Sequence, residues 1–169
     1  MTILITGMSG TGKSAALAEL VRRGHRVVDT DLSAWSIEVA WPDGSSTEQL
    51  WREDAMDALL ARHVTGWLFV AGCASNQGSF YDRFDAVVLL SAPREVMLRR
   101  IATRSTSSFG KGADERQRIL ADLEAVEPLL RASSTAEIVT TIPVVKVVDA
   151  LESIARRADA GSAGRFTRD

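Results

Sequence analysis

Apolar runs alternate with helical patterns along this chain of 169 residues. Five of the runs are short and continuous, as expected of strands that are buried on both faces of a sheet. They lie at residues 2–6, 25–29, 67–71, 86–90 and 137–140. Strand, loop and helix units in succession predict an α/β fold, a three-layer, doubly wound five-stranded parallel sheet that binds its ligands at the carboxyl ends of the strands.

The segments between these runs carry apolar residues at helical spacing. The first such segment, residues 14–23, ends at Gly24. Three later groups each share one helical face: Leu50, Trp51, Ala55, Ala58 and Leu59; Ile119, Leu120, Leu123, Val126 and Leu130; and Val144, Val147, Val148, Leu151 and Ile154. Residues 105–112 (STSSFGKG) predict a mobile loop, and the polar residues 159–169 predict a flexible C-terminal tail. We therefore expect a single domain over residues 1–158.

The composition is that of a globular domain, with 46% apolar and 25% charged residues. No apolar segment is long enough to span a bilayer, and the chain begins in a strand without room for a signal peptide, so we expect a cytoplasmic protein with no membrane partner. Cys73 is the single cysteine, which excludes an internal disulfide and a cysteine zinc site. A net charge of −2 gives no reason to expect binding to nucleic acid. Nothing in the sequence predicts the oligomeric state.

Residues 7–14 (GMSGTGKS) carry the clearest chemistry, because they form a complete G-x-x-x-x-G-K-S phosphate-binding loop between the first strand and the first helix. Glycines let successive backbone N–H groups turn toward the phosphates of ATP or GTP. The lysine then reaches the β- and γ-phosphates, and the serine hydroxyl can bind Mg²⁺. The predicted nucleotide-binding residues of this loop are Gly7, Ser9, Gly10, Thr11, Gly12, Lys13 and Ser14. The cofactors predicted are ATP and Mg²⁺.

Asp29 and Asp31 follow the second strand, at the same edge of the sheet as the phosphate loop. Carboxylates spaced i and i+2 in an extended chain point to one side, so both could face the transferring phosphate. Mg²⁺ takes hard oxygen ligands, and Asp29 could hold it while Asp31 orients or deprotonates an acceptor hydroxyl. The alternative is that one of them only caps a helix beginning near Leu32.

These motifs resemble the small P-loop kinases, the superfamily that includes nucleoside-monophosphate kinases, shikimate kinase and gluconate kinase, over roughly residues 1–156. In the shikimate-kinase-like branch an Asp-x-Asp follows the second strand. Its first Asp lies near Mg²⁺ and its second on the acceptor hydroxyl. The resemblance therefore implies the same roles for Asp29 and Asp31.

The resemblance extends to the adenine side of the site. Arg100-Ile101-Ala102-Thr103-Arg104 is similar to the R-I-x-x-R end of a helix in adenylate kinases. This implies that Arg100 lies on adenine and that Arg104 contacts phosphate, beside a lid at about residues 103–114. Thr141 and Pro143 match a loop that borders adenine in these kinases, and Arg131 resembles an arginine that shikimate kinases bring back toward the acceptor.

The predicted lid region is basic and the acceptor region is acidic. Residues 94–118 carry seven basic against three acidic residues, a net +4, which suits closure over a transferring phosphoryl group or, alternatively, a solvated helix face. Residues 29–57 hold eight acidic residues against one base, Arg52, which disfavours a dianionic acceptor. Arg52 could bind one carboxylate or phosphate of the acceptor, or pair with a helical neighbour such as Glu48.

Three tryptophans, Trp35, Trp41 and Trp51, fall in the same acidic segment. They either anchor two short helices or form an aromatic wall of the acceptor pocket. Asn76 and Gln77, in the loop after the third predicted strand, could hydrogen-bond the acceptor. The triple glycine that shikimate kinases have there is absent, which argues against shikimate itself.

We therefore expect an ATP- and Mg²⁺-dependent phosphotransferase that moves the γ-phosphoryl group to a hydroxyl of a small molecule. The expected catalytic residues are Lys13, Asp31 and Arg104, the expected metal ligands are Ser14 and Asp29, and the expected substrate-binding residues are Asp31, Arg52, Asn76, Gln77 and Arg131. Two alternatives remain: a nucleoside-monophosphate kinase, and an NTP-binding switch or NTPase that acts on a protein partner.

Overall fold

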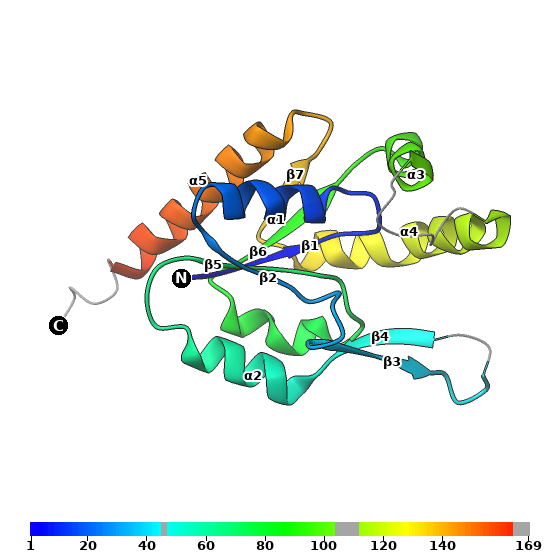
Figure 1. The fold of residues 1–169 in the computed structure, drawn as a ribbon, viewed down its shortest axis with the longest axis horizontal. Coiled ribbons are helices and arrows are strands. Elements are labelled where there is room, and N and C mark those ends of the chain that lie inside the picture. Colours follow the sequence, from blue (N-terminus) through cyan, green and yellow to red (C-terminus); the bar gives the residue numbers. More distant parts are fainter. Residues whose placement is uncertain (45–46, 104–111, 164–169) are drawn as a thin grey trace.

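The central sheet has five parallel strands. The computed structural model describes residues 1–44, 47–103 and 112–163. The strands follow the order β2–β5–β1–β6–β7 (Figure 1). Their bounds are β1 (Thr2–Thr6), β2 (Arg26–Asp29), β5 (Leu68–Ala71), β6 (Ala86–Ser91) and β7 (Ala136–Val139). Each predicted strand is confirmed to within one residue at both ends. Because β1 is central, the loop that follows it opens at the middle of the carboxyl edge of the sheet.

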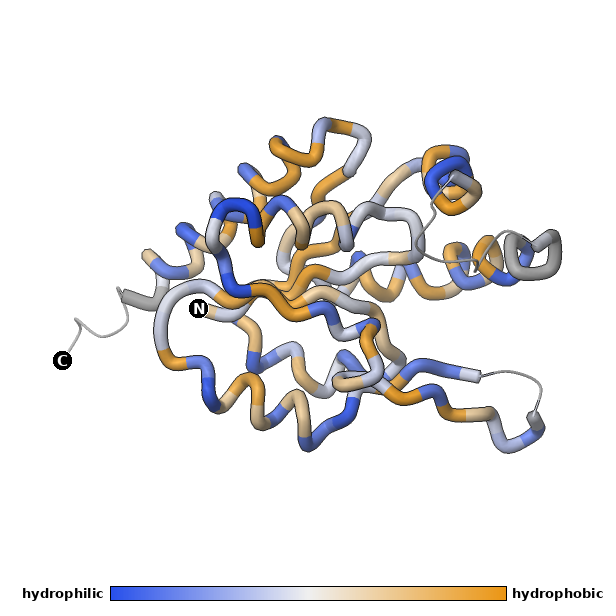
Figure 2. The backbone as a smooth tube through the Cα atoms, viewed as in Figure 1, coloured by the Kyte–Doolittle hydropathy of each residue, from blue (hydrophilic) through white to orange (hydrophobic). Residues whose placement is uncertain are grey.

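Helices cover both faces of the sheet, which confirms the three-layer fold. α1 (Lys13–Arg22) and α5 (Val144–Ala163) lie on one face, and α2 (Glu53–Arg62) lies on the other with the 3₁₀ helix η1 (Gln77–Arg83) (Figure 1). Successive side chains of a strand point to opposite faces. Ile3 and Ile5 accordingly pack with α1 and α5, whereas Leu4 packs with α2 and η1. Figure 2 shows the hydrophobic segments of the strands gathered between these helices.

Two further helices, α3 (Arg94–Thr103) and α4 (Ala113–Ser133), lie toward the carboxyl end of the strands (Figure 1). The helical patterns predicted for α4 and α5 are confirmed. However, α5 continues to Ala163, so residues 159–163, predicted to be part of a flexible tail, are helical instead. No helix in the described ranges is both long and apolar enough to cross a bilayer.

An antiparallel hairpin, β3 (Ser36–Ala40) and β4 (Thr47–Trp51), extends from the molecule between β2 and α2 (Figure 1). The predictions were wrong here. Leu50 and Trp51 end β4 instead of belonging to a helix, α2 begins only at Glu53, and no helix begins near Leu32.

The hairpin owes its attachment to Trp51, which is 2% exposed and packs against the rings of Phe80 and Phe84. As the last residue of β4, it brings the base of the hairpin against η1. Trp41, between the two strands, is 48% exposed. The three clustered tryptophans therefore do not anchor two short helices.

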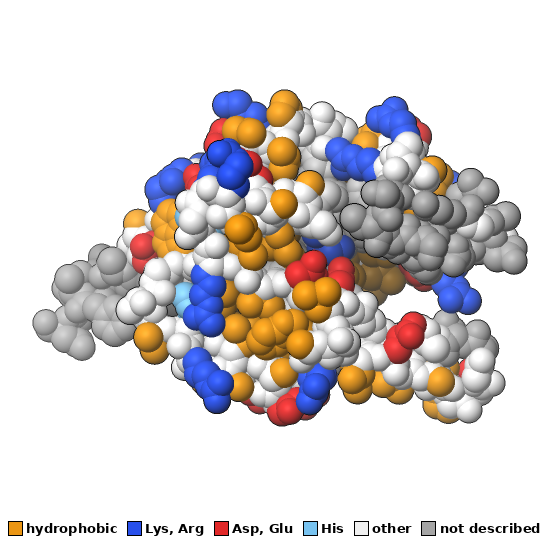
Figure 3. Space-filling model, viewed as in Figure 1, with side chains coloured by type: hydrophobic (Ala, Val, Ile, Leu, Met, Phe, Trp, Pro, Cys, Tyr) orange, Lys and Arg blue, Asp and Glu red, His pale blue; other side chains and the backbone are white. Residues whose placement is uncertain are grey.

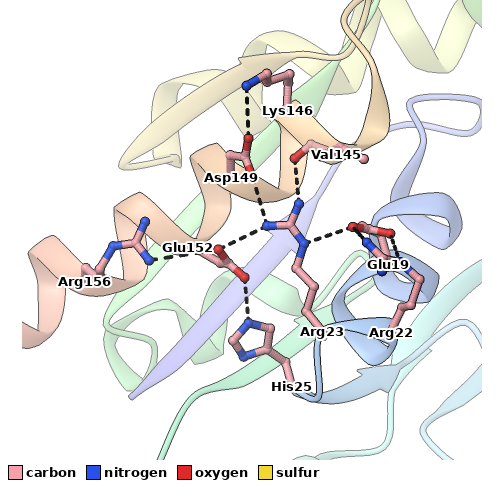
Figure 4. A network of polar contacts seen from close by, with 9 residues as sticks. All are labelled: Glu19, Arg22, Arg23, His25, Val145, Lys146, Asp149, Glu152 and Arg156. Atoms are coloured by element: carbon pink, nitrogen blue, oxygen red, sulfur yellow. Dashed lines mark hydrogen bonds and ion pairs between the residues drawn. The ribbon is translucent and has the colours of Figure 1, made fainter.

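A network of ion pairs joins the end of α1 to α5 (Figure 4). The Arg23 guanidinium lies 2.9 Å from Glu19, 2.9 Å from Asp149 and 3.1 Å from Glu152. Hydrogen bonds from Arg22 and Arg23 lower the pKa of Glu19 from 4.5 to about 2. The network fixes α5 against the helix that follows the phosphate loop.

Candidate active site

The phosphate loop joins the end of β1 to the start of α1. Gly7, Gly10 and Gly12 have positive φ angles of 147°, 84° and 100°. A Cβ atom at Gly7 would lie 2.3 Å from the carbonyl oxygen of Leu90, so no larger residue fits there. The first N–H groups of α1 have no side-chain cap and remain available to an anion, which the helix dipole also favours.

A cavity of about 420 Å³ adjoins this loop. Lys13 and Ser14, at the start of α1, both line it. The Lys13 ammonium donates hydrogen bonds to the carbonyl oxygens of Gly7, at 2.6 Å, and Met8, at 3.4 Å, which holds it beside the loop. The lining residues are Met8, Ser9, Gly10, Gly12, Lys13, Ser14, Ala15, Asp31, Arg100, Thr140, Ile142, Val144 and Val147. We name this space the donor cavity.

Arg100 ties the phosphate loop to the segment after β7. Its guanidinium donates to the carbonyl oxygen of Gly10 at 3.3 Å, and to the hydroxyl and carbonyl oxygens of Thr140 at 2.9 and 2.6 Å. The Thr140 hydroxyl in turn donates to the carbonyl oxygen of Thr11 at 2.7 Å. Two parts of the donor cavity wall that lie far apart in the sequence are thus fixed to each other.

The predictions for the adenine side agree with this geometry only in part. Arg100 lines the donor cavity, and its contact with adenine stays a prediction. Thr141 and Pro143, which were predicted to border adenine, do not line this cavity. Their neighbours Thr140 and Ile142 line it instead. Arg104 and most of the predicted lid lie outside the described residues.

A second cavity, of about 780 Å³, opens on the other side of the phosphate loop, and we name it the acceptor cavity. Its walls come from the hairpin, the loop after β5, η1 and α4. Figure 3 shows the surface hollowed beside the hairpin. The lining residues are Gly7, Met8, Ser9, Lys13, Asp31, Trp41, Thr47, Glu48, Gln49, Cys73, Ala74, Ser75, Gln77, Gly78, Tyr81, Arg118, Asp122, Val126, Leu129, Leu130 and Ser133.

The two cavities share a wall, because Met8, Ser9, Lys13 and Asp31 line both of them. A group bound in either cavity therefore lies beside the same ammonium and the same carboxylate. This is the arrangement that transfer between two ligands requires.

The structure separates Asp29 from Asp31. Asp31 lines both cavities, whereas Asp29 lines neither and instead accepts a hydrogen bond from the N–H of Asp31 at 3.1 Å. Of the two carboxylates expected to face the phosphate, only Asp31 therefore reaches the cavities beside the phosphate loop. Desolvation by the surrounding protein raises the pKa of Asp31, and the positive charge of Lys13 opposes this rise.

The oxygen atoms at this site suit Mg²⁺, which prefers hard oxygen ligands and keeps several waters or phosphate oxygens of its own. Ser14 and Asp31 line the donor cavity, and Asp29 is the last residue of β2, two positions before Asp31. Within the described ranges, no group of three or more His, Cys, Asp or Glu side chains could hold a metal ion. A magnesium ion here would therefore depend on few protein ligands.

Two residues after β5, Asn76 and Gln77, were predicted to bind the acceptor, and one of them lines the acceptor cavity. Gln77 lines the acceptor cavity, where its side chain contacts the hydroxyls of Thr6, at 3.1 Å, and Tyr81, at 3.0 Å. Asn76 does not line it. Its side-chain amide pairs with the backbone of Trp51, so the prediction of substrate binding by Asn76 is corrected to a structural role.

The two arginines predicted to bind substrate also lie outside the acceptor cavity. Arg52 is 3.6 Å from Asp54, and Arg131 is 2.7 Å from Glu127 and 2.9 Å from Glu137. The pKa of Glu137 is lowered mainly by the hydrogen bonds that it accepts from Arg131. Both side chains are thus engaged by carboxylates on the surface, which is why sequence position alone misplaced them.

Most of the residues that shape the acceptor cavity were not predicted from the sequence. Glu48, Tyr81 and Asp122 line it but were not assigned to the site. Trp41 also lines it, in agreement with the alternative that a tryptophan forms an aromatic wall. Cys73 is a further lining residue, and burial raises the pKa of its thiol.

The sequence matches the model of the AAA domain family over residues 3–121, which is more than half of the chain. The chain belongs to this AAA domain family. A protein of Archaeoglobus fulgidus, provisionally named an adenylate kinase, is 27% identical to this chain over 157 residues. The aligned region covers 92% of this chain and 83% of the relative.

Solved structures agree on the fold. A gluconokinase from Sinorhizobium meliloti aligns with a TM-score of 0.61 at 20% identity, covering 96% of this AAA domain protein and 96% of that chain. A shikimate kinase from Acinetobacter baumannii, in complex with shikimate, aligns with a TM-score of 0.60 at 19% identity, covering 95% and 93%. The chain therefore has the P-loop kinase fold that its motifs predicted.

Proposed function

We propose that this protein is an ATP- and Mg²⁺-dependent phosphotransferase that moves the γ-phosphoryl group of ATP to a hydroxyl of a small molecule. The observation that carries the proposal is the wall shared by the two cavities, with Lys13 and Asp31 at the point where they meet. Phosphoryl transfer depends mainly on positioning and electrostatic stabilisation, and a shared wall of this kind supplies both.

Each residue of the shared wall has a separate role in this proposal. The loop N–H groups and Lys13 bind the phosphates and stabilise the charge that develops during transfer. Asp31 accepts a hydrogen bond from the acceptor hydroxyl and takes its proton, a role that suits a carboxyl whose pKa is raised. Mg²⁺, when bound by Ser14 and Asp29 directly or through water, neutralises phosphate charge. Arg104 would act from the lid.

The acceptor in this proposal is not a dianion. A phosphate group is usually held by several arginines that form paired hydrogen bonds. Arg83 pairs with Asp57 at the surface, as Arg52 and Arg131 pair with carboxylates of their own, and none of the three lines the acceptor cavity. This supports a neutral or cationic hydroxyl compound.

The carboxylates of the acceptor cavity favour the same conclusion. Glu48 and Asp122 line it, and within the described ranges neither forms an ion pair. Arg118 is the one arginine in the described part of the lining. Two carboxylates and one guanidinium, away from the phosphate loop, favour an uncharged or positive acceptor.

A nucleoside-monophosphate kinase is the second candidate. Two observations favour it: the relative from Archaeoglobus fulgidus bears the name of an adenylate kinase, and Arg118 lies where it could bind the phosphate of an acceptor. Binding by one arginine would give a monophosphate a weaker hold than the several arginines such a substrate normally meets.

The test is acceptor-dependent release of ADP by the parent protein, with Lys13→Ala as the inactive control. The panel contains an amino polyol (glucamine), a neutral polyol (sorbitol), gluconate, shikimate, AMP and CMP. We expect the highest kcat/KM with a neutral or cationic compound. A nucleoside monophosphate that exceeds every such compound would replace the first proposal by the second. Slow hydrolysis of ATP that no acceptor accelerates would instead favour the NTP-binding switch.

A further inference from the structure

Thr30 lies between the two aspartates and is fully buried. Each of its polar groups has a partner. Its N–H and its hydroxyl both donate to the carbonyl oxygen of Ala71 in β5, at 2.8 and 2.9 Å, and its own carbonyl oxygen accepts from the hydroxyl of Ser36 at the start of β3. The backbone that leads into Asp31 is therefore fixed on both sides, to the sheet and to the hairpin.

Trp51 fixes the side chain of Thr30. Its indole N–H donates to the Thr30 hydroxyl oxygen at 2.9 Å, inside the core. A hydroxyl has one proton to donate and lone pairs to accept with. Because the Thr30 proton is directed to Ala71, the indole occupies the accepting side, and the rotamer of Thr30 is determined from two directions.

The backbone of Trp51 is hydrogen-bonded to the loop after β5, which forms another wall of the acceptor cavity. Its N–H donates to Oδ1 of Asn76 at 2.8 Å, and its carbonyl oxygen accepts from Nδ2 of Asn76 at 3.0 Å. The Asn76 amide thus pairs with β4 as a neighbouring strand would. One step along, the N–H of Ser75 donates to the carbonyl oxygen of Gln49 at 2.9 Å, and both of these residues line the acceptor cavity.

Asp31 has few constraints of its own. Its N–H is held by Asp29, and its carboxylate accepts a hydrogen bond from the backbone of Cys73, but within the described residues no ion pair restrains the side chain. The direction of the carboxylate therefore depends on the backbone at Thr30. That backbone depends in turn on the contacts that Trp51 and Ala71 make with it.

We propose that Thr30 and Trp51 are positioning residues, which hold Asp31 at the shared wall of the two cavities and join its placement to that of the acceptor hairpin. The proposal rests on the proposed phosphotransferase function. The consequence is kinetic: loss of the Trp51–Thr30 hydrogen bond lowers the rate of transfer and leaves the binding of ATP·Mg²⁺ intact, because the phosphate loop takes no part in the network.

Four variants test this proposal. Thr30→Val removes the hydroxyl at nearly constant shape, Thr30→Ser restores it, and Trp51→Phe removes the indole N–H but keeps a ring against η1. Thr135→Val is the matched control, because the Thr135 hydroxyl also bonds a backbone carbonyl, that of Val87 at 3.0 Å, but lies before β7 and lines neither cavity. Loss of the Thr135 hydroxyl can lower the stability of the protein but does not change the contacts that place Asp31.

The assay is transfer from ATP·Mg²⁺ to whichever of glucamine, sorbitol, gluconate, shikimate and AMP the parent uses best, or to water where it uses none. We expect kcat to fall at least tenfold in Thr30→Val and Trp51→Phe, since displacement of a catalytic group by about 1 Å costs up to about 100-fold. The KM for ATP·Mg²⁺ should stay within about twofold of the parent, because the donor contacts are unchanged. Thr30→Ser should recover most of kcat.

A spectroscopic measurement separates positioning from general loss of structure. The indole N–H resonance of Trp51, assigned by its absence in Trp51→Phe, should exchange slowly with solvent in the parent and in Thr30→Ser, and faster in Thr30→Val. Thr135→Val should keep both the slow resonance and the parental kcat, even if its melting temperature falls. Parental kcat in Thr30→Val, measured where it is folded, would overturn this inference alone. A parent that uses none of these acceptors would remove the proposed function, and a parent that does not transfer to water either would remove this inference with it.

Discussion

Gly72, directly after β5, gives the sharpest test of the packing behind the active site. An added Cβ at this position would lie 1.8 Å from the hydroxyl oxygen of Thr30 and 3.2 Å from the Thr30 Cβ. A carbon and an oxygen in contact normally stand about 3.3 Å apart, so Gly72→Ala leaves the pair about 1.5 Å too close. The Thr30 side chain must rotate or the backbone of β5 must shift.

Rotation of Thr30 breaks two buried hydrogen bonds. The indole of Trp51 loses its acceptor, and a buried donor left without a partner costs about 1–3 kcal/mol. The bond from Thr30 to Ala71 is lost as well, at about 1 kcal/mol. We therefore expect Gly72→Ala to lower the free energy of unfolding by about 3 kcal/mol. For a chain of this length that corresponds to a fall of about 6–12 °C in melting temperature.

Urea unfolding followed by tryptophan fluorescence and circular dichroism measures this loss. Gly78→Ala is the matched control, since nothing lies within 4 Å of an added Cβ there and the residue has no positive φ angle. It should stay within about 0.5 kcal/mol of the parent. Adding Thr30→Ala to Gly72→Ala should cost less than the sum of the two single changes, because the clashing oxygen is gone. A Gly72→Ala protein as stable as Gly78→Ala would refute the reasoning.

Three further predictions concern the donor cavity and the α1–α5 network. Lys13→Ala should lower kcat/KM for ADP release by at least about 1000-fold with an unchanged melting temperature, since it removes several kcal/mol of transition-state stabilisation, and activity within about threefold of the parent would contradict this. Arg100→Ala removes three hydrogen bonds to the loop and to Thr140, so calorimetry should give a Kd for ATP·Mg²⁺ raised about tenfold, with Arg100→Lys recovering only part because an ammonium lacks the planar fork. The pKa of Glu19 is lowered from 4.5 to about 2 on folding, so its contribution to stability is complete above pH 4.5 and is lost as the pH falls toward 2. The melting temperature of the parent should therefore fall more steeply than that of Glu19→Gln over this range, and parallel curves would count against the ion pairs.

The sheet could be predicted from sequence because its five strands are short, continuous apolar runs, as burial on both faces requires. The hairpin could not, because Leu50 and Trp51 also fit the helical spacing that continues into α2. A different signal was present. Residues 43–44, Asp-Gly, are a turn pair, and they lie between the two segments that become β3 and β4.

The donor side of the site was predictable for a local reason: its chemistry is contained in eight consecutive residues, 7–14. The acceptor side is assembled from the hairpin, the loop after β5 and α4, and no spacing in the sequence reveals which side chains meet there. Arg131 illustrates the difficulty. Glu127, four residues before it on α4, is one of its partners, and that spacing already allowed for an ion pair. The second partner, Glu137, becomes available only through the fold.

The wall that the two cavities share has a consequence for inhibitor chemistry. Since Met8, Ser9, Lys13 and Asp31 line both spaces, one molecule that joins a nucleotide polyphosphate to an acceptor analogue would place both of its halves against the same four residues. Its second half then binds at the effective concentration that the tether sets, so its affinity should exceed that of either half by orders of magnitude. A series of such bisubstrate compounds, with tethers of graded length and different acceptor halves, would also report which acceptor the cavity prefers.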